Sequence, residues 1–242
     1  TTATLSIPRA ELAATSSQNL VFFGGGWNVT TVYDRVDIYN TLNGSWSTAT
    51  LSQPRYALAA TSVGNFVLFG GGVNSTSLSK VVDVFDVTNN TWTTATLSEG
   101  RCCLAATSVD NRYALFGGGS DPSNVVDIFD SLSGMWNTTT LSQARAELAA
   151  TSLGNLAFFG GGQTTGKQPS NVVDIFNSTT QTWSIATLSQ SRSQLASSSI
   201  GEIVAFGGGS SYSSFVDMYN ITSNRWFTLN LSQPRRWLAS TS

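Results

Sequence analysis

Residues 55–92 read RYALAATSVGNFVLFGGGVNSTSLSKVVDVFDVTNNTW, and the fold follows from this stretch because its pattern recurs along the chain. The pattern begins with an arginine and passes through a short apolar run that ends in three glycines. It then continues to a Val-Asp pair, an aromatic residue and a tryptophan. The same order occurs in five copies, spaced by about 43 to 47 residues. A period of this length indicates a repeat architecture in which every unit is one supersecondary element.

Four sets of residues hold fixed places in the repeat. The glycine triplets occupy residues 24–26, 70–72, 117–119, 160–162 and 207–209. The aspartates are Asp37, Asp83, Asp127, Asp174 and Asp217. The tryptophans are Trp46, Trp92, Trp136, Trp183 and Trp226. The arginines are Arg9, Arg55, Arg101, Arg145, Arg192 and Arg235. Positions that are identical in every repeat are most simply explained by the fold.

Each repeat predicts four short β-strands. In the quoted copy they are residues 55–62, residues 66–69, residues 81–85 and a strand that begins at Trp92. The third alternates as a half-buried strand does, and the fourth is rich in Thr and Ser, as an exposed outer edge should be. Turn dipeptides such as Asn-Asn lie between the third and fourth strands. Since no window has a sustained 3.6-residue apolar period, we expect essentially no helix.

Four-stranded units of this period, with successive glycines, a later aromatic residue and a tryptophan, resemble kelch repeats. The resemblance covers the whole chain, and it implies an all-β fold, a β-propeller of antiparallel four-stranded blades. Two features depart from the kelch pattern: a glycine triplet replaces the usual doublet, and Phe stands at three of the five usual Tyr positions.

The ends of the chain bear on the number of blades. Residues 1–6 look like an additional fourth strand, and residues 235–242 look like an additional first strand. The hairpin of roughly 30 residues that would join them is absent. We therefore predict one propeller domain over residues 1–242, a fragment of a longer chain with five complete repeats and a split sixth, and we favour a six-bladed ring. A five-bladed ring with two spare strands is the alternative.

The repeated charged and aromatic residues have structural explanations. A buried guanidinium needs a counter-charge, so we expect the repeated arginines and aspartates to pair, between strands or between neighbouring blades. The alternative is a cationic ring that binds a ligand. The tryptophans are assigned to packing between blades rather than to sugar stacking. The glycines are assigned to positive φ angles and close backbone approach, since no helix N-terminus follows them to hold a phosphate.

The composition excludes several kinds of site. The chain has no histidine, two cysteines and a formal net charge of −2. Without histidine there is no Ser-His-Asp or Cys-His catalytic arrangement and no imidazole metal site. Two cysteines are too few for a zinc ribbon, and the weak charge argues against nucleic-acid binding. No apolar run reaches about 18 residues, so no membrane insertion is expected. We predict no enzyme activity, no metal and no cofactor.

Two segments vary among the repeats: the pair of residues after each arginine and the connection between the second and third strands. In an antiparallel blade both lie on the same face, and loops on a rigid scaffold are the usual place for recognition. Aromatic and Arg side chains are favoured anchors of interfaces. The predicted ligand-binding residues are Tyr56, Arg236, Trp237, Trp27, Tyr33, Tyr212, Glu11, Glu147 and Gln194. Ordinary variation of surface loops is the alternative explanation.

Cys102 and Cys103 are neighbours in a predicted strand, so we expect their side chains to point to opposite faces. A vicinal disulfide would strain the backbone, and the two residues are interpreted as small buried fillers. Glu11 and Glu147 lie in different repeats, and nothing in the sequence sets a separation suited to acid–base chemistry.

The chain carries many Asn-X-Ser/Thr triplets that would fall on loops or on the outer strand, where an N-linked glycan can be accommodated. These possible glycosylation sites are Asn28, Asn43, Asn74, Asn89, Asn137, Asn177, Asn220 and Asn230. They favour an extracellular or cell-surface location, although a Ser/Thr-rich chain yields such triplets by chance and the cysteine content is low. A cytoplasmic location is the alternative.

The first functional hypothesis is a non-catalytic binding or structural module that presents the variable face to a protein or a glycan. Self-assembly through the open repeat ends is a further expectation. Some propellers of the kelch type are enzymes, but the copper-dependent ones need histidine ligands, so a catalytic site would require residues outside this chain. The third hypothesis is an intracellular adaptor for protein interactions.

Overall fold

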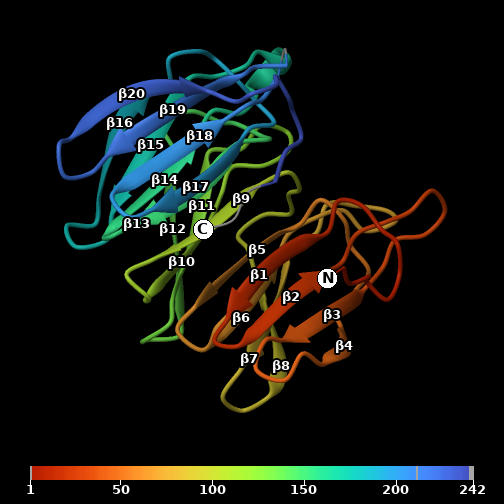
Figure 1. Ribbon diagram of the computed structural model, residues 1–242. Helices are drawn as coiled ribbons and strands as arrows, with labels where there is room; N and C mark the ends of the chain where they lie inside the picture. The colour runs from red at the N-terminus through yellow and green to blue at the C-terminus, as the bar shows by residue number, and fades with distance from the viewer. Residues whose placement is uncertain (1, 211, 240–242) are drawn as a thin grey trace. The chain divides into compact units, whose positions relative to one another are not determined.

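The computed structural model describes residues 2–210 and 212–239. Within them the chain forms five antiparallel sheets of four strands each, so the all-β prediction is confirmed (Figure 1). The chain divides into two compact units, residues 1–104 and residues 105–242. Each sheet is one blade, and the strands follow one another in chain order across it. No helix in the described part is long and apolar enough to cross a membrane.

The first unit contains two blades. Their strands are β1 (Ala13–Ser17), β2 (Leu20–Gly24), β3 (Arg35–Asn40) and β4 (Trp46–Thr50), then β5 (Ala59–Val63), β6 (Phe66–Gly70), β7 (Val81–Asp86) and β8 (Thr91–Thr96). The strands β1 and β5 are the first strands of their blades and pack against each other. The outer strands β4 and β8 are mostly exposed, as their Thr-rich sequences predict.

The second unit contains three blades. Their strands are β9 (Ala105–Val109), β10 (Tyr113–Gly117), β11 (Val125–Asp130), β12 (Met135–Thr140), β13 (Ala149–Leu153), β14 (Leu156–Gly160), β15 (Val172–Asn177), β16 (Thr182–Thr187), β17 (Ala196–Ile200), β18 (Ile203–Gly207), β19 (Phe215–Asn220) and β20 (Arg225–Asn230). First strands again pack side by side, β9 against β13 and β13 against β17.

Three predictions about local structure need correction. Each first strand is shorter than expected: the arginine and the three residues after it lie outside the strand, because a positive φ angle interrupts it there. Residues 2–6 and 235–239 are not strands; the rest of the two expected end strands lies outside the described residues. One short 3₁₀ turn, Thr165–Lys167, occurs in the described chain where no helix was expected.

Neighbouring blades pack by placing an aromatic ring of one blade over a glycine of the preceding blade. A Cβ atom added to Gly24 would lie 2.5 Å from the Phe69 ring, and one added to Gly160 would lie 2.5 Å from the Phe206 ring. Gly117 lies under Phe159 in the same way. The first glycine of each of these triplets is therefore required by the next blade, which explains why the motif has three glycines.

The second and third glycines of the triplet have the positive φ angles that were predicted. Gly161 has φ 66° and Gly162 has φ 103°. The backbone also comes close, since a Cβ added to Gly161 would lie 2.6 Å from the carbonyl oxygen of Arg192. Only glycine combines this conformation with so little space.

The tryptophans pack mainly within their own blade, which corrects the prediction of packing between blades. Trp46 stands opposite Tyr39 in the pairing of β3 with β4, and their ring centroids are 5.0 Å apart. The same cross-strand pair recurs as Phe85 with Trp92 at 5.0 Å. The register of the two outer strands brings these rings together, so the tryptophan covers its own blade.

The repeated arginines join neighbouring blades. Arg145 is fully buried and forms an ion pair with Asp174. Its guanidinium also donates to the carbonyl oxygens of Gly161 and Val172, each at 2.6 Å. Its own carbonyl oxygen accepts a hydrogen bond of 2.8 Å from the amide of Gly119 in the preceding blade. Burial lowers the pKa of the Arg145 guanidinium, and the charge of Asp174 opposes that shift.

The same ion pair is seen in four repeats of the described chain, always within one blade. The pairs are Arg9–Asp37, Arg55–Asp83, Arg145–Asp174 and Arg192–Asp217. The predicted pairing of repeated charges is therefore confirmed for these residues, which belong to the scaffold.

Candidate functional site

The two variable segments of a repeat lie side by side at one end of the blade. Ala10, which follows the first arginine, and Trp27, which follows the first glycine triplet, exchange two backbone hydrogen bonds of 2.9 Å. Tyr56 and Val73 are joined in the same way in the next repeat, at 3.1 and 2.8 Å. Because these bonds use only the backbone, the side chains at these positions are free to differ between repeats.

Within each unit, a ladder of backbone hydrogen bonds joins successive repeats through the second residue after the arginine. In the first unit the amide of Ala57 donates to the carbonyl of Glu11 at 3.0 Å, and the amide of Cys103 donates to that of Ala57 at 3.0 Å. In the second unit Gln194 donates to Glu147 at 3.1 Å, and Trp237 donates to Gln194 at 3.2 Å. We call these six the ladder residues.

Every ladder residue has a positive φ angle, between 52° and 58°. Residues other than glycine are uncommon in this region, and holding one there costs about 1 to 3 kcal/mol. The same repeat uses glycine at other left-handed positions such as Gly25 and Gly26. Yet the ladder carries Glu, Gln, Cys, Ala and Trp. Larger side chains are therefore kept where glycine would fit the backbone better.

In the first unit the structure brings two of the predicted residues into contact. The rings of Trp27 and Tyr56 are 5.6 Å apart, and Trp27 is 36% exposed. Tyr33 has a supporting role, since its hydroxyl accepts a hydrogen bond of 2.7 Å from the Asn28 side chain. Glu11 is exposed on the ladder. Trp27 and Tyr56 therefore form an aromatic patch on the variable end of the first two blades.

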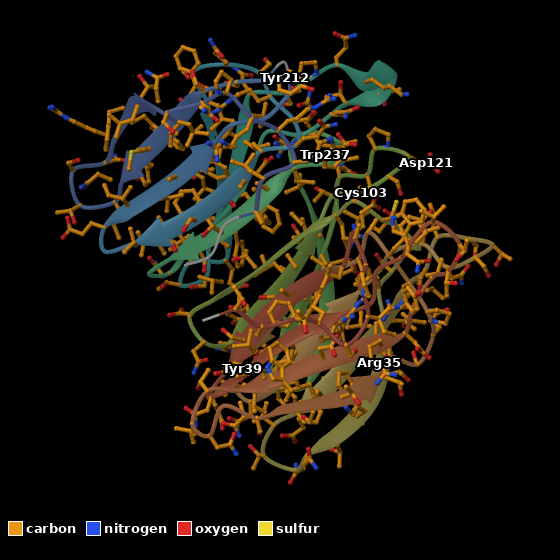
Figure 2. All side chains as sticks on the ribbon, turned by 45° about the vertical axis from the view of Figure 1, so that its right-hand side comes forward. Arg35, Tyr39, Cys103, Asp121, Tyr212 and Trp237 are labelled. Carbon is orange, nitrogen blue, oxygen red and sulfur yellow. The ribbon has the colours of Figure 1, made fainter. Side chains whose placement is uncertain are left out.

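In the second unit the predicted residues form two groups. The Glu147 carboxylate accepts hydrogen bonds from the side-chain amides of Gln194, at 2.9 Å, and of Gln163. Arg236 stacks over the ring of Tyr212, with its guanidinium carbon 4.8 Å from the ring centroid. Tyr212 is 60% exposed. Trp237, the last ladder residue, is 65% exposed. Figure 2 labels Tyr212 and Trp237 on the connecting segments of this unit.

The cysteine prediction is wrong in one respect. Cys102 is 8% exposed, as expected of a buried filler, but the sulfur atoms of Cys102 and Cys103 are only 3.3 Å apart. Cys103 has φ 55°, so the chain here is not a strand and its side chains do not alternate.

The sequence did not indicate the ladder itself or the role of Gln163. The ladder is a property of the backbone, and it tolerates side chains of every kind, so no residue type marks it. The ladder residues could have been located by position, because each lies two residues after an arginine of the repeat. The residues that follow the glycine triplets are Trp27, Val73, Ser120, Gln163 and Ser210, so polarity at this place did not single out Gln163.

The variable end offers aromatic surface, amides and one arginine. No group of three His, Cys, Asp or Glu side chains that could hold a metal ion occurs in the described part of the chain. Exposed aromatic rings and an arginine stacked on a tyrosine are features that protein interfaces favour.

Comparison with known proteins agrees with the fold. The sequence profile of the KLHDC2/KLHL20/DRC7 Kelch-repeats domain matches residues 57–240. No curated protein matches the chain. The matched segment covers four of the five blades, and its glycines, aspartates and tryptophans are the residues whose structural roles are described above. The chain therefore belongs to the kelch-repeat family, a family of β-propeller modules that bind proteins.

Proposed function

We propose that this protein binds a protein partner through the variable ends of its blades, and that it is not an enzyme. The ladder is the main support for this proposal. Its six residues all have side chains, although their left-handed backbone conformation is one that glycine adopts more easily. The backbone hydrogen bonds of the ladder do not require these side chains, although Glu147 and Gln194 also hydrogen-bond to each other through their side chains. Contact with a partner does explain them.

The anchors of the proposed interface differ between the two units. The first unit supplies Trp27, whose ring is tilted against that of Tyr56. The second supplies Arg236 over Tyr212, and the exposed Trp237. Large aromatic and Arg side chains carry most of the binding free energy at protein interfaces. Both anchor pairs are held in place by intramolecular contacts, so little side-chain entropy would be lost on binding.

Replacing the aromatic pair should weaken binding without unfolding the blades. The variants are Tyr56→Ala and Trp27→Val, and both residues already occur at equivalent places, in Ala10 and Val73. We expect each variant to lose at least about 2 kcal/mol of binding free energy, roughly thirtyfold in Kd, as truncated hot-spot aromatics do. The measurement uses peptides selected on the wild-type protein from a random-peptide phage library.

The matched control for this experiment is Leu42→Ala. Leu42 is 76% exposed in the turn between β3 and β4, at the other end of the same blade from Trp27. Peptides bound at the variable end should keep their affinity for this variant. Peptides that lose affinity for Leu42→Ala, and not for Tyr56→Ala, would place the binding surface elsewhere.

We also propose an extracellular or cell-surface location, on the basis of the Asn-X-Ser/Thr triplets. Asn137 is exposed on β12, the outermost strand of its sheet, which has a neighbouring strand on one side only. Asn177 is partly buried, and its side-chain oxygen accepts hydrogen bonds from Thr179 and Thr180. These two triplets are therefore expected to behave differently.

Expression through a secretory pathway tests the location. Asn137→Gln should remove one glycan from the intact mass, and Asn177→Gln should leave the mass of the attached glycans unchanged. Peptide N-glycosidase treatment followed by mass spectrometry measures both. A secreted protein that carries no glycan on Asn137 would favour the cytoplasmic alternative.

A further inference from the structure

The two cysteines form a vicinal pair with an unusual geometry. Their sulfur atoms are 3.3 Å apart, although the residues are adjacent in sequence. In an extended strand adjacent side chains point to opposite faces, which would keep the sulfurs apart. The left-handed conformation of Cys103, with φ 55°, brings them to the same side.

This conformation belongs to the repeat and does not depend on the sulfur atoms. Cys103 is a ladder residue whose amide donates to the carbonyl of Ala57 at 3.0 Å. The ladder residues Ala57 and Glu147, which have no sulfur, have φ angles of 52° and 54°. The fold therefore holds the two thiols close together before any reaction, and such preorganisation accelerates a step that joins them.

We propose that Cys102 and Cys103 are a redox-active dithiol that closes to a vicinal disulfide by exchange with a low-molecular-weight disulfide such as oxidised glutathione. The sulfur–sulfur distance must shorten from 3.3 Å to about 2.05 Å. This inference does not rest on the proposed binding function.

The reaction takes two exchange steps. Cys103 is more exposed than Cys102, so its thiolate attacks oxidised glutathione, forms a mixed disulfide and releases one glutathione thiolate. The Cys102 thiolate then attacks the Cys103 sulfur and releases the second glutathione. The protein loses two electrons and two protons, and the glutathione disulfide gains them to become two thiols.

The resulting disulfide should be easy to reduce again. Its ring closes over two adjacent residues, and strained disulfides have higher reduction potentials than structural ones. Because Cys103 lies on the ladder, oxidation would change the surface at the variable end of the first unit (Figure 2). The pair would then sense the thiol–disulfide balance of its surroundings.

To test the proposal, the folded protein is treated with oxidised glutathione, and the intact mass of the protein is followed by mass spectrometry. The variants are Cys102→Ala and Cys103→Ala, and alanine already stands at the equivalent places of Ala10, Ala57 and Ala146. We expect the wild type to lose two hydrogen atoms and to accumulate no glutathione adduct. Cys102→Ala should keep one glutathione, because the second thiol is missing. Cys103→Ala should react at least about tenfold more slowly, because Cys102 is buried.

A second probe is phenylarsine oxide, which needs two neighbouring thiols. It should bind the wild type in a one-to-one ratio and neither single variant. The proposal is overturned if the wild type accumulates the same lasting glutathione adduct as Cys102→Ala. It is also overturned if oxidised glutathione removes the two hydrogen atoms only from protein that has been unfolded in urea. A third contrary result is that phenylarsine oxide does not bind the folded wild type.

Discussion

Asp174→Asn is expected to lower the free energy of unfolding by about 3 to 5 kcal/mol, the usual cost of removing one partner of a buried ion pair. The side chain of Arg145 is 0% exposed and that of Asp174 is 2% exposed. Without the carboxylate, the guanidinium keeps its carbonyl contacts but has no counter-charge in an environment of low dielectric constant. Urea unfolding followed by tryptophan fluorescence measures the loss.

Two further variants distinguish the loss of the ion pair from a general disruption of the fold. Arg145→Met combined with Asp174→Asn should cost clearly less than the sum of the single losses, because no buried charge is left unpaired. Asp130→Asn is the control at a pair with one exposed partner: the Asp130 side chain is 12% exposed, but that of Arg112 is 43% exposed and stays in contact with water, so the loss should be smaller. Equal losses for Asp174→Asn and Asp130→Asn would contradict the role assigned to burial.

Gly160→Ala is expected to destabilise the second unit by about 3 kcal/mol, at the upper end of the cost of overpacking. The added methyl carbon would lie 2.5 Å from the ring of Phe206, which is 0% exposed. The same change at Gly207 should alter stability by less than about 0.5 kcal/mol. There the nearest atom is a methyl of Val216 at 3.5 Å.

Gly160→Ala and Gly207→Ala make the same substitution at the same position of the motif in two blades. The effects of the substitution on chain entropy and on strand propensity are therefore the same in both variants. Urea denaturation of both variants gives the comparison. Phe206→Ala should also lose less stability in the Gly160→Ala background than in the wild type, because the new methyl fills part of the space left by the ring. Similar losses at Gly160 and Gly207 would mean that the glycine is required by its own strand and not by the next blade.

Much of the scaffold could be predicted because its causes are local or repeated. Residues 81–85 were predicted to form a strand, and β7 is found there. The alternation predicted a half-buried strand, which is wrong, because residues 82–85 are all buried and β7 is covered on both faces. The pairing of Arg55 with Asp83 followed from the cost of burying a charge alone. The positive φ angles of Gly71 and Gly72 followed from the absence of a Cβ atom.

The predictions that failed depended on which residues meet across space. Trp92 was assigned to a neighbouring blade, but the register between β7 and β8 places it on Phe85 of its own blade. Cys102 and Cys103 were placed on opposite faces because the left-handed turn of the ladder was not foreseen. In both cases the residue types were compatible with either arrangement.

The sequence by itself determined the repeat, its four strands, its buried charges and the end of the blade where variation gathers. These follow from periodicity, polarity and the conformational limits of single residues. Only the tertiary structure decided why the first glycine of a triplet is needed, how the blades are linked through the ladder, and which aromatic residues form pairs. These features depend on backbone atoms and on neighbouring blades. Every residue except proline has the same backbone donor and acceptor, so a hydrogen bond between two main-chain segments does not require a particular residue type and cannot be recognised in the sequence.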